Sequence, residues 1–311
     1  MHGNSFGRTL CALLCASASA ICIAGAAARG QAAALDAQVI EQVSGVEPTV
    51  EPDGVIRIGW SRTGVPVSVD GRRLPPAAGL GSWAAFKATS HGAMIMGDTV
   101  VFEDEITPAM DAAFAHGLEV TALHNHFVFD RPPVYFMHIG GTGNAAELAE
   151  GVAAVWDAIR AIRKAHPVPQ DRFPGGAPAL SGEFDVSALK SILGSAPSIM
   201  DGVIKFTFPR TGRMHDTEIG GSMGMSTWAA FVGSQESASV DGDFIMTAGE
   251  VQPVMQELRE ADIHVVALHN HMIGEQPPFY FLHYWGKGEA NPLAEGVKAA
   301  LKAQRPAGSS Q

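Results

Sequence analysis

The sequence has very little cysteine, and what it has lies near its start. Cys11, Cys15 and Cys22 are the only three cysteines among 311 residues. Because we expect this N-terminal segment to be removed, the mature chain has no cysteine. It can therefore contain no disulfide framework, no thiolate metal site and no cysteine nucleophile. Any metal ligands must come from His, Asp or Glu.

Basic residues are also scarce. The chain has 21 Lys and Arg against 32 Asp and Glu, which gives a formal net charge of −11 and a pI near 5.5. Nucleic acids and anionic membranes require a basic face, so both are excluded as partners. The 46% of hydrophobic residues is typical of a soluble protein with two domain-sized cores. We expect its partner to be a small-molecule substrate or a metal ion.

Charged residues are absent from residues 9–28, which are apolar and small, and Ala-rich triplets follow. This pattern predicts a secretory signal peptide over residues 1–34, cleaved at a small residue. A retained membrane anchor is the alternative. None of the three cysteines follows the small residue that a lipoprotein signal needs. We expect a periplasmic or secreted mature chain without a membrane span.

The chain contains an internal repeat. An offset of 145 residues aligns Ser82–Ala154 with Thr227–Ala299 without a gap and with about thirty identities. With a small insertion the match extends upstream, where Arg62-Thr63-Gly64 pairs with Arg210-Thr211-Gly212. We predict repeat units at 35–165 and 184–304, a Pro- and Gly-rich linker at 166–183, and a disordered tail at 305–311.

Each unit is predicted to have the same order of elements: a helix, three strands, a short helix, two strands and a last helix. Two tandem homologous α+β units, with a mixed or antiparallel sheet and flanking helices, would form a pseudo-symmetric pair. The predicted positions are a helix near Val39 or Leu189, strands at 55–60 or 203–208, 83–88 and 93–102, a helix with Pro108 or Pro253 in its first turn, strands at 119–127 and 134–139 or 264–272 and 279–285, and a helix at 145–163 or 292–303.

Histidines recur at fixed spacing in both copies, as His-x-His followed after eleven residues by His. In a strand, His269 and His271 would project from one face, roughly 6.6 Å apart, and a returning strand would bring His283 opposite them. Three imidazoles with an open position suit a catalytic zinc, although copper, nickel or iron would also accept them. The alternative is a set of buried, hydrogen-bonded histidines. The predicted metal ligands are His269, His271, His283, His124, His126 and His138.

Other polar residues shared by both copies are candidates for supporting roles. Glu105 and Glu250 are predicted as a metal ligand or general base, although an acidic residue at a helix start is also favoured by the helix dipole. Arg62 and Arg210 are candidates for binding an anionic substrate, or alternatively turn residues at a strand end. Asp98 and Asp243 each follow a glycine and are expected in hairpin turns.

The sequence resembles a bacterial family of unknown function that includes the mycobacterial lipoproteins LppY and LpqO. The resemblance covers nearly all of the mature chain and lies in three motifs. These are Ala-Leu-His-Asn-His, Pro-Pro-x-Tyr-Phe-x-His and Leu-Ala-Glu-Gly, each present in both copies. The resemblance implies no established activity.

The histidine spacing also resembles the zinc motif of α-acetolactate decarboxylase and of a related fold group that contains a human zinc-dependent ester hydrolase. That resemblance implies zinc ligation by His269, His271 and His283, with duplicated α+β units. The Gly-Gly that precedes the distal histidine in that motif is replaced here by residues 280–282.

These observations lead to three hypotheses. The first is a periplasmic or secreted zinc-dependent hydrolase or decarboxylase, in which Glu250 or Glu105 moves protons. The second is a non-catalytic copper- or zinc-binding or sensing protein of the envelope. The third is a structural scaffold whose histidines belong to the core.

Overall fold

A computed structural model describes residues 34–169 and 182–304. The predicted signal peptide, most of the predicted linker and the predicted tail lie outside these residues. Within the described ranges, no helix is long and apolar enough to cross a membrane.

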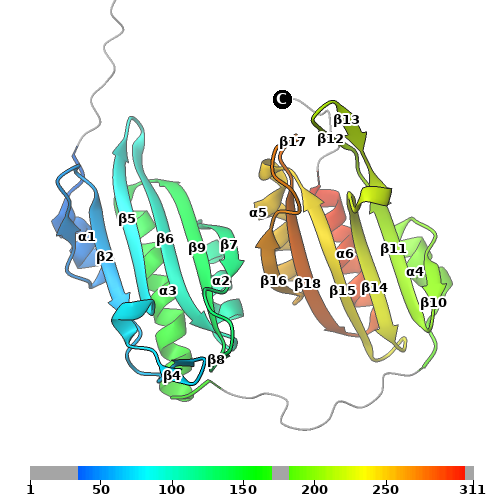
Figure 1. Cartoon of the computed structure of the whole chain (residues 1–311), viewed down its shortest axis with the longest axis horizontal. Helices are drawn as coiled ribbons and strands as arrows, with labels where there is room; N and C mark the ends of the chain where they lie inside the picture. Colours follow the sequence, from blue (N-terminus) through cyan, green and yellow to red (C-terminus); the bar gives the residue numbers. More distant parts are fainter. Residues whose placement is uncertain (1–33, 170–181, 305–311) are drawn as a thin grey trace, which may run out of the picture. The chain divides into compact units, whose positions relative to one another are not determined.

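The first repeat is an antiparallel sheet with helices on one face (Figure 1). The chain enters through α1 and forms strands β1, β2, β5 and β6 of the main sheet, with the short strands β3 and β4 between β2 and β5. It then passes through α2 to β7, returns through β9 and ends in α3. Its elements are α1 (Ala37–Ser44), β1 (Thr49–Val50), β2 (Ile56–Ser61), β3 (Ser68–Val69), β4 (Arg72–Arg73), β5 (Gly81–Thr89), β6 (Gly92–Phe102), α2 (Ile106–Ala115), β7 (Glu119–His124), β8 (Asp130–Arg131), β9 (Val134–Gly143) and α3 (Ala145–Ala165).

The second repeat has the same order of elements, so the α+β class and the duplication are confirmed. Its last helix is shorter than that of the first repeat, with 14 residues against 21. Its elements are α4 (Val186–Leu193), β10 (Ser198–Met200), β11 (Val203–Pro209), β12 (Gly212–Met214), β13 (Thr217–Ile219), β14 (Ser226–Gly233), β15 (Ala238–Met246), α5 (Ala248–Glu260), β16 (His264–His269), β17 (Glu275–Gln276), β18 (Tyr280–Gly288) and α6 (Ala290–Ala303).

Local sequence explains where the helices begin and end. The side chains of Asp36, Asn144 and Asp185 accept backbone N–H groups at the starts of α1, α3 and α4. Gly45 and Gly194 end α1 and α4 with φ of 68° and 73°, a conformation that glycine adopts without strain.

The helix α5 begins earlier than predicted. It is opened by a capping box between Thr247 and Glu250, so Pro253 lies inside the helix and not in its first turn. The corresponding helix of the first repeat does have Pro108 in its first turn, as predicted.

The strands of both repeats form one sheet of 12 strands, in the order β1-β2-β5-β6-β9-β7-β16-β18-β15-β14-β11-β10. The repeats meet at β7 and β16, where Leu123 pairs with Leu268. These two residues are equivalent under the 145-residue offset, so the pairing is pseudo-symmetric. Gln252 supports it by hydrogen bonds to both backbone groups of Val120, at 3.1 and 2.8 Å.

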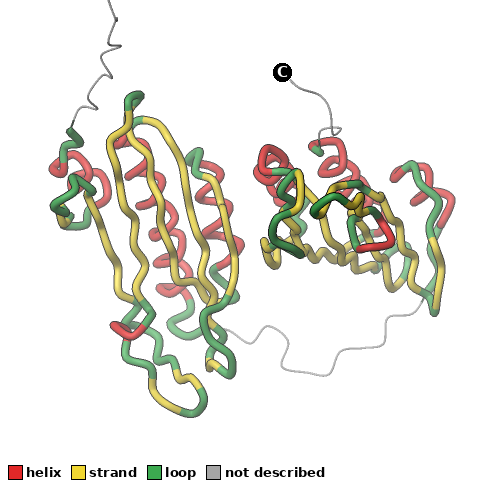
Figure 2. The backbone as a smooth tube through the Cα atoms, turned by 45° about the horizontal axis from the view of Figure 1, so that its top comes forward, coloured by secondary structure: helices red, strands yellow, loops and turns green. Residues whose placement is uncertain are grey.

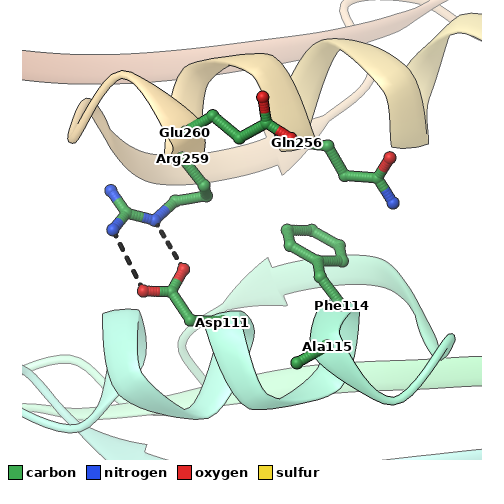
Figure 3. A pocket seen from close by; sticks show the side chains of 6 residues that line it. All are labelled: Asp111, Phe114, Ala115, Gln256, Arg259 and Glu260. Carbon is green, nitrogen blue, oxygen red and sulfur yellow. Dashed lines mark hydrogen bonds and ion pairs between the residues drawn. The ribbon is translucent and has the colours of Figure 1, made fainter.

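Helices α2 and α5 also face each other at this junction (Figure 3). The guanidinium of Arg259 binds the carboxylate of Asp111 through two hydrogen bonds, at 2.9 and 3.2 Å. With Phe114 and Gln256, these side chains line a pocket of about 460 Å³.

The two faces of the sheet have different environments. In both repeats the helices pack on one face, where alternate residues such as Ile56, Ile58 and Phe86 are buried in the main core. Figure 2 shows the helices on one side of the strands. On the opposite face, the small sheets β4-β3-β8 and β13-β12-β17 cover only one end, over apolar clusters that include Phe136 and Phe281. The rest of that face is available to a site.

Several strand ends differ from the prediction, and β9 and β18 continue to Gly143 and Gly288, beyond the predicted ends at 139 and 285. Strands β7 and β16 stop at His124 and His269, three residues before the predicted ends. The next residue explains why, because the side-chain amides of Asn125 and Asn270 donate to the carbonyls of Phe127 and Met272, each at 2.8 Å. These local bonds turn the backbone away from the sheet.

Candidate metal centre

The second-repeat cluster comes from three neighbouring strands. His269 is the last residue of β16, His271 follows in the loop held by Asn270, and His283 lies on β18. Asp243, on β15, is directly opposite His283 in the antiparallel register. Side chains of directly paired residues project from the same face, so the carboxylate and the imidazoles converge on the face opposite the helices.

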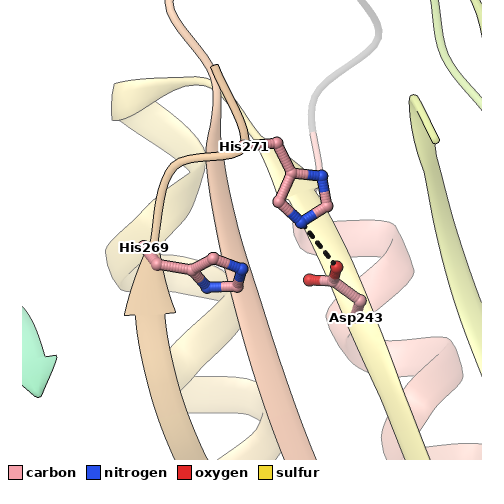
Figure 4. Close-up of side chains that lie close together, drawn as sticks. All are labelled: Asp243, His269 and His271. Carbon is pink, nitrogen blue, oxygen red and sulfur yellow. Dashed lines mark ion pairs between the residues drawn. The ribbon is translucent and has the colours of Figure 1, made fainter. Parts of the chain in front are cut away.

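The distances in this cluster match those of metal ligands. One potential ligand atom from each of Asp243, His269 and His271 lies within 4.8 Å of the others (Figure 4). The Nε2 atom of His271 is 3.4 Å from Oδ2 of Asp243. The ring of His283 is 4.8 Å from that of His269, and its Nδ1 lies 3.2 Å from the carbonyl oxygen of Gly242. If Nδ1 donates to this carbonyl, Nε2 keeps its lone pair for a ligand or a proton.

The first repeat contains the equivalent cluster. Nε2 of His124 is 3.1 Å from Nε2 of His138, and the latter is 3.8 Å from Oδ2 of Asp98. The ring of His126 lies 5.1 Å from that of His124. The structure thus brings all six sequence-predicted histidines together in two groups of three, and adds one aspartate to each.

An aromatic ring supports the loop histidine in each repeat. The rings of His126 and Phe136 are stacked at 3.4 Å between centroids, and those of His271 and Phe281 are stacked at the same distance. Both phenylalanines are buried and belong to the apolar clusters under the small sheets. Because His126 and His271 lie in loops, stacking on a buried phenylalanine ring restricts the orientation of each imidazole.

The donor atoms fit a transition-metal ion. Around a tetrahedral zinc with bonds of about 2.0–2.1 Å, neighbouring ligand atoms are roughly 3.3 Å apart. In the first repeat two such separations are 3.1 and 3.8 Å. In the second repeat one is 3.4 Å, and all three candidate atoms lie within 4.8 Å of one another. Oδ1 of Asp98, Oδ1 of Asp243 and Nδ1 of His269 are buried without a hydrogen-bond partner among the described residues. Such atoms are costly to bury unless something binds them.

The electrostatics of the cluster also favour a cation. Burial raises the pKa of Asp243, and the nearby histidines offset this only in part. Burial lowers the pKa of His269 and of His271, although the charge of Asp243 acts in the opposite direction. Asp98 and His126 are shifted in the same directions, with burial as the main cause. Neutral imidazoles around a destabilised carboxylate are therefore ready to accept a positive ion.

The expectation that Asp98 and Asp243 occupy hairpin turns is wrong. Both lie within long strands, and the preceding glycine serves close packing instead of a turn. A Cβ on Gly242 would lie 2.2 Å from the carbonyl oxygen of Trp228 and 2.2 Å from the hydroxyl of Tyr284. Asp98 and Asp243 are the site residues that the sequence analysis missed, and the signal was the Gly-Asp pair repeated in both copies.

Glu105 and Glu250 form buried ion pairs instead of joining the histidines. Arg62 donates to both carboxylate oxygens of Glu105, at 2.7 and 3.0 Å, and Arg210 does the same to Glu250, at 2.8 and 2.6 Å. The metal-ligand group of the second repeat includes Asp243 and not Glu250.

The two glutamates also accept hydrogen bonds from backbone N–H groups. An oxygen of Glu105 accepts the N–H of Phe102, and an oxygen of Glu250 accepts that of Thr247. In each repeat the glutamate and the arginine are thus bonded to each other, and the structure does not bring either of them into the histidine cluster.

Fold and site together define a class: a duplicated α+β protein with one His/Asp cluster per repeat. The chain belongs to the family described as "Domain of Unknown Function (DUF1259)", whose model matches residues 38–158 and 187–303. The two matches agree with the internal repeat. No curated protein matches the chain.

Two solved structures show limited similarity. One is the trimeric bacterial microcompartment shell protein PduB, with 8% identity over 82% of this chain and 89% of that chain, and a TM-score of 0.21. Another is EtuB from Clostridium kluyveri, with 12% identity over 82% of this chain and 88% of that chain, and a TM-score of 0.20. TM-scores this low support no argument about function.

Proposed function

We propose that the protein is a periplasmic or secreted metal-dependent enzyme with one transition-metal site in each repeat. The observation that carries the proposal is the convergence of a buried carboxylate with imidazoles, made twice in one chain. Zinc is the ion we expect, because a site of imidazole nitrogens and one carboxylate oxygen suits it. The reaction class is hydrolysis or decarboxylation of a small molecule.

In the second repeat, Asp243, His269 and His271 would hold the ion, and His283 would stand beside it as a further ligand or as the proton-transfer group. A zinc ion held by these residues would polarise a substrate carbonyl and lower the pKa of bound water. His271 faces solvent on its outer side, with 34% of its side chain exposed, so a substrate has access. His283, positioned by the Gly242 carbonyl, takes the proton-handling role first expected of Glu250.

A second candidate is the non-catalytic copper- or zinc-binding or sensing protein. One specific observation favours it. In the second repeat, His283 lies beside the group of Asp243, His269 and His271, and a fourth ligand would fill a tetrahedral site without water or substrate. In that case the metal would bind tightly and no turnover would follow.

The signal-like N-terminus supports the proposed location outside the cytoplasm. The shared motifs support the narrower proposal that the chain is a relative of the LppY and LpqO lipoproteins.

The test is elemental analysis of the mature protein purified without a histidine tag, followed by a screen of ester and 2-keto-acid substrates. Wild-type protein should contain stoichiometric zinc. His269→Ala with His271→Ala should remove the metal of one repeat, whereas His91→Ala, which changes an exposed histidine outside both clusters, should remove none. Metal with turnover supports the enzyme, and metal without turnover supports the binding protein. Protein without metal would contradict both the enzyme and the metal-binding hypothesis and would favour the structural scaffold.

A further inference from the structure

The first repeat has a basic pocket that is independent of the histidine clusters. Its last helix, α3, has 21 residues, whereas α6 has 14. The additional turns of α3 carry Arg160, Arg163 and Lys164, which lie beside the segment that follows β2. Together they enclose a pocket of about 410 Å³.

The lining of this pocket is positively charged and partly aromatic. It contains four cationic side chains and no acidic one. The guanidinium carbons of Arg62 and Arg160 lie 4.9 and 4.7 Å from the centre of the Trp60 ring, so the ring positions both. The hydroxyl-bearing residues Ser61 and Thr63 complete the wall.

The positive charge is only partly balanced by neighbouring carboxylates. Asp104 and Glu105 pair with Arg163, Glu105 also pairs with Arg62, and Asp157 pairs with Arg160. Four cations against three carboxylates leave an excess of one positive charge, in a chain whose formal net charge is −11.

Two groups in the pocket have unused hydrogen-bonding capacity. Nη1 of Arg163 is buried without a hydrogen-bond partner among the described residues. Lys164 is exposed at the rim and forms no ion pair within the described part of the chain. A buried guanidinium N–H without an acceptor is costly, and an incoming oxyanion would satisfy it.

The described part of the second repeat has different side chains at the equivalent positions. Phe208 stands where the first repeat has Trp60, and the positions equivalent to Arg160 and Arg163 lie outside the described residues. The side chain of Gln304 instead donates to the carbonyl of Ile245, at 2.6 Å. Among the described residues, the basic pocket is thus built from side chains of the first repeat.

We propose that this pocket binds a small oxyanion that carries at least two negative charges, of the phosphate or polycarboxylate type. The guanidinium group of Arg163 would provide a directional N–H donor, and Arg160 and Lys164 would provide charge at the entrance. The volume suits a small organic anion and not a polymer. This inference does not depend on the metal sites.

The test is calorimetric titration with inorganic phosphate and, separately, with citrate, in a low-salt buffer. Wild-type protein should show saturable binding of at least one of them. Arg160→Gln with Lys164→Gln should weaken it about tenfold or more, and so should Lys164→Glu alone. Arg57→Gln is the matched control, because Arg57 also lies over a tryptophan, Trp83, but outside the pocket, and it should bind as wild type does.

Zinc content is measured on the same samples and should be unchanged in all three variants, which separates this proposal from that of the metal sites. Phosphate and citrate distinguish the two ligand types. Absence of saturable binding of both anions to the wild type would overturn the proposal, and so would a double variant that binds as tightly as the wild type.

Discussion

Asp243→Asn should change stability and metal affinity in opposite directions. In the metal-free protein, the Asp243 carboxylate is buried, its Oδ1 has no hydrogen-bond partner among the described residues, and burial raises its pKa. A buried group left without partners costs about 1–3 kcal/mol, and a charged one costs more than a neutral amide of the same shape. The substitution should therefore stabilise the metal-free protein by about 1 kcal/mol, which raises Tm by roughly 2–4 °C.

Zinc binding should fall in the same variant. Removal of one charged ligand costs about 1.5–3 kcal/mol, equivalent to about 10- to 100-fold in affinity at that site. Thermal unfolding of chelator-treated protein measures the first effect, and competition with a chelating dye measures the second. Asp241→Asn is the control, because Asp241 lies two residues away on the same strand but outside the ligand group. The reasoning would be refuted if Asp243→Asn had a lower Tm than the wild type after chelator treatment and bound zinc with the wild-type affinity.

The remaining predictions concern the residues that support the sites. Arg210→Met should destabilise the fold by about 3–5 kcal/mol in denaturant unfolding, because it leaves the Glu250 carboxylate buried and unpaired, yet it should leave zinc content unchanged. Burial acts to raise the pKa of Glu250, but hydrogen bonds from Arg210 and Thr247 outweigh it and lower the pKa. The ionised Glu250 carboxylate therefore stabilises the folded state at pH values above its pKa in the unfolded chain, and this stabilisation is lost as pH falls through its lower pKa in the folded protein. Glu250→Gln should accordingly make the free energy of unfolding depend less on pH in the acid range. Phe281→Leu should weaken zinc binding by about 0.5–1.5 kcal/mol in dye competition, because it removes the ring on which His271 stacks. Gly242→Ala should lower Tm severely, since its Cβ would meet the Trp228 carbonyl at 2.2 Å, and a normal Tm would contradict the close packing described here.

The sequence was sufficient to predict most of the fold, because hydrophobic periodicity and the repeat register act over many residues. The helices at Val39 and Leu189, the long strands and the last helix of each repeat are all present. Strand ends were harder to predict. The stop after His124 depends on one side-chain bond from Asn125, which the alternation of apolar residues does not reveal.

The histidines of the site could be predicted from the sequence, but the residues whose positions depend on long-range packing could not. Four of the six histidines lie on paired strands, so their convergence follows from strand pairing. His126 and His271 lie in the loops that follow β7 and β16. The role of Asp98 does not follow from local sequence, because Gly-Asp is typical of turns, and only the sheet register places it opposite His138. The pairing of Glu105 with Arg62 joins positions 43 residues apart and depends on tertiary packing that no local pattern encodes.

The most direct test of the account is an anomalous-diffraction map, recorded at the zinc absorption edge, from crystals of the untagged mature protein. The account predicts a peak within coordination distance of Asp243, His269 and His271, and a second peak beside Asp98, His124 and His138. Crystals grown with zinc in which both clusters show only water, or in which zinc binds elsewhere on the surface, would contradict it.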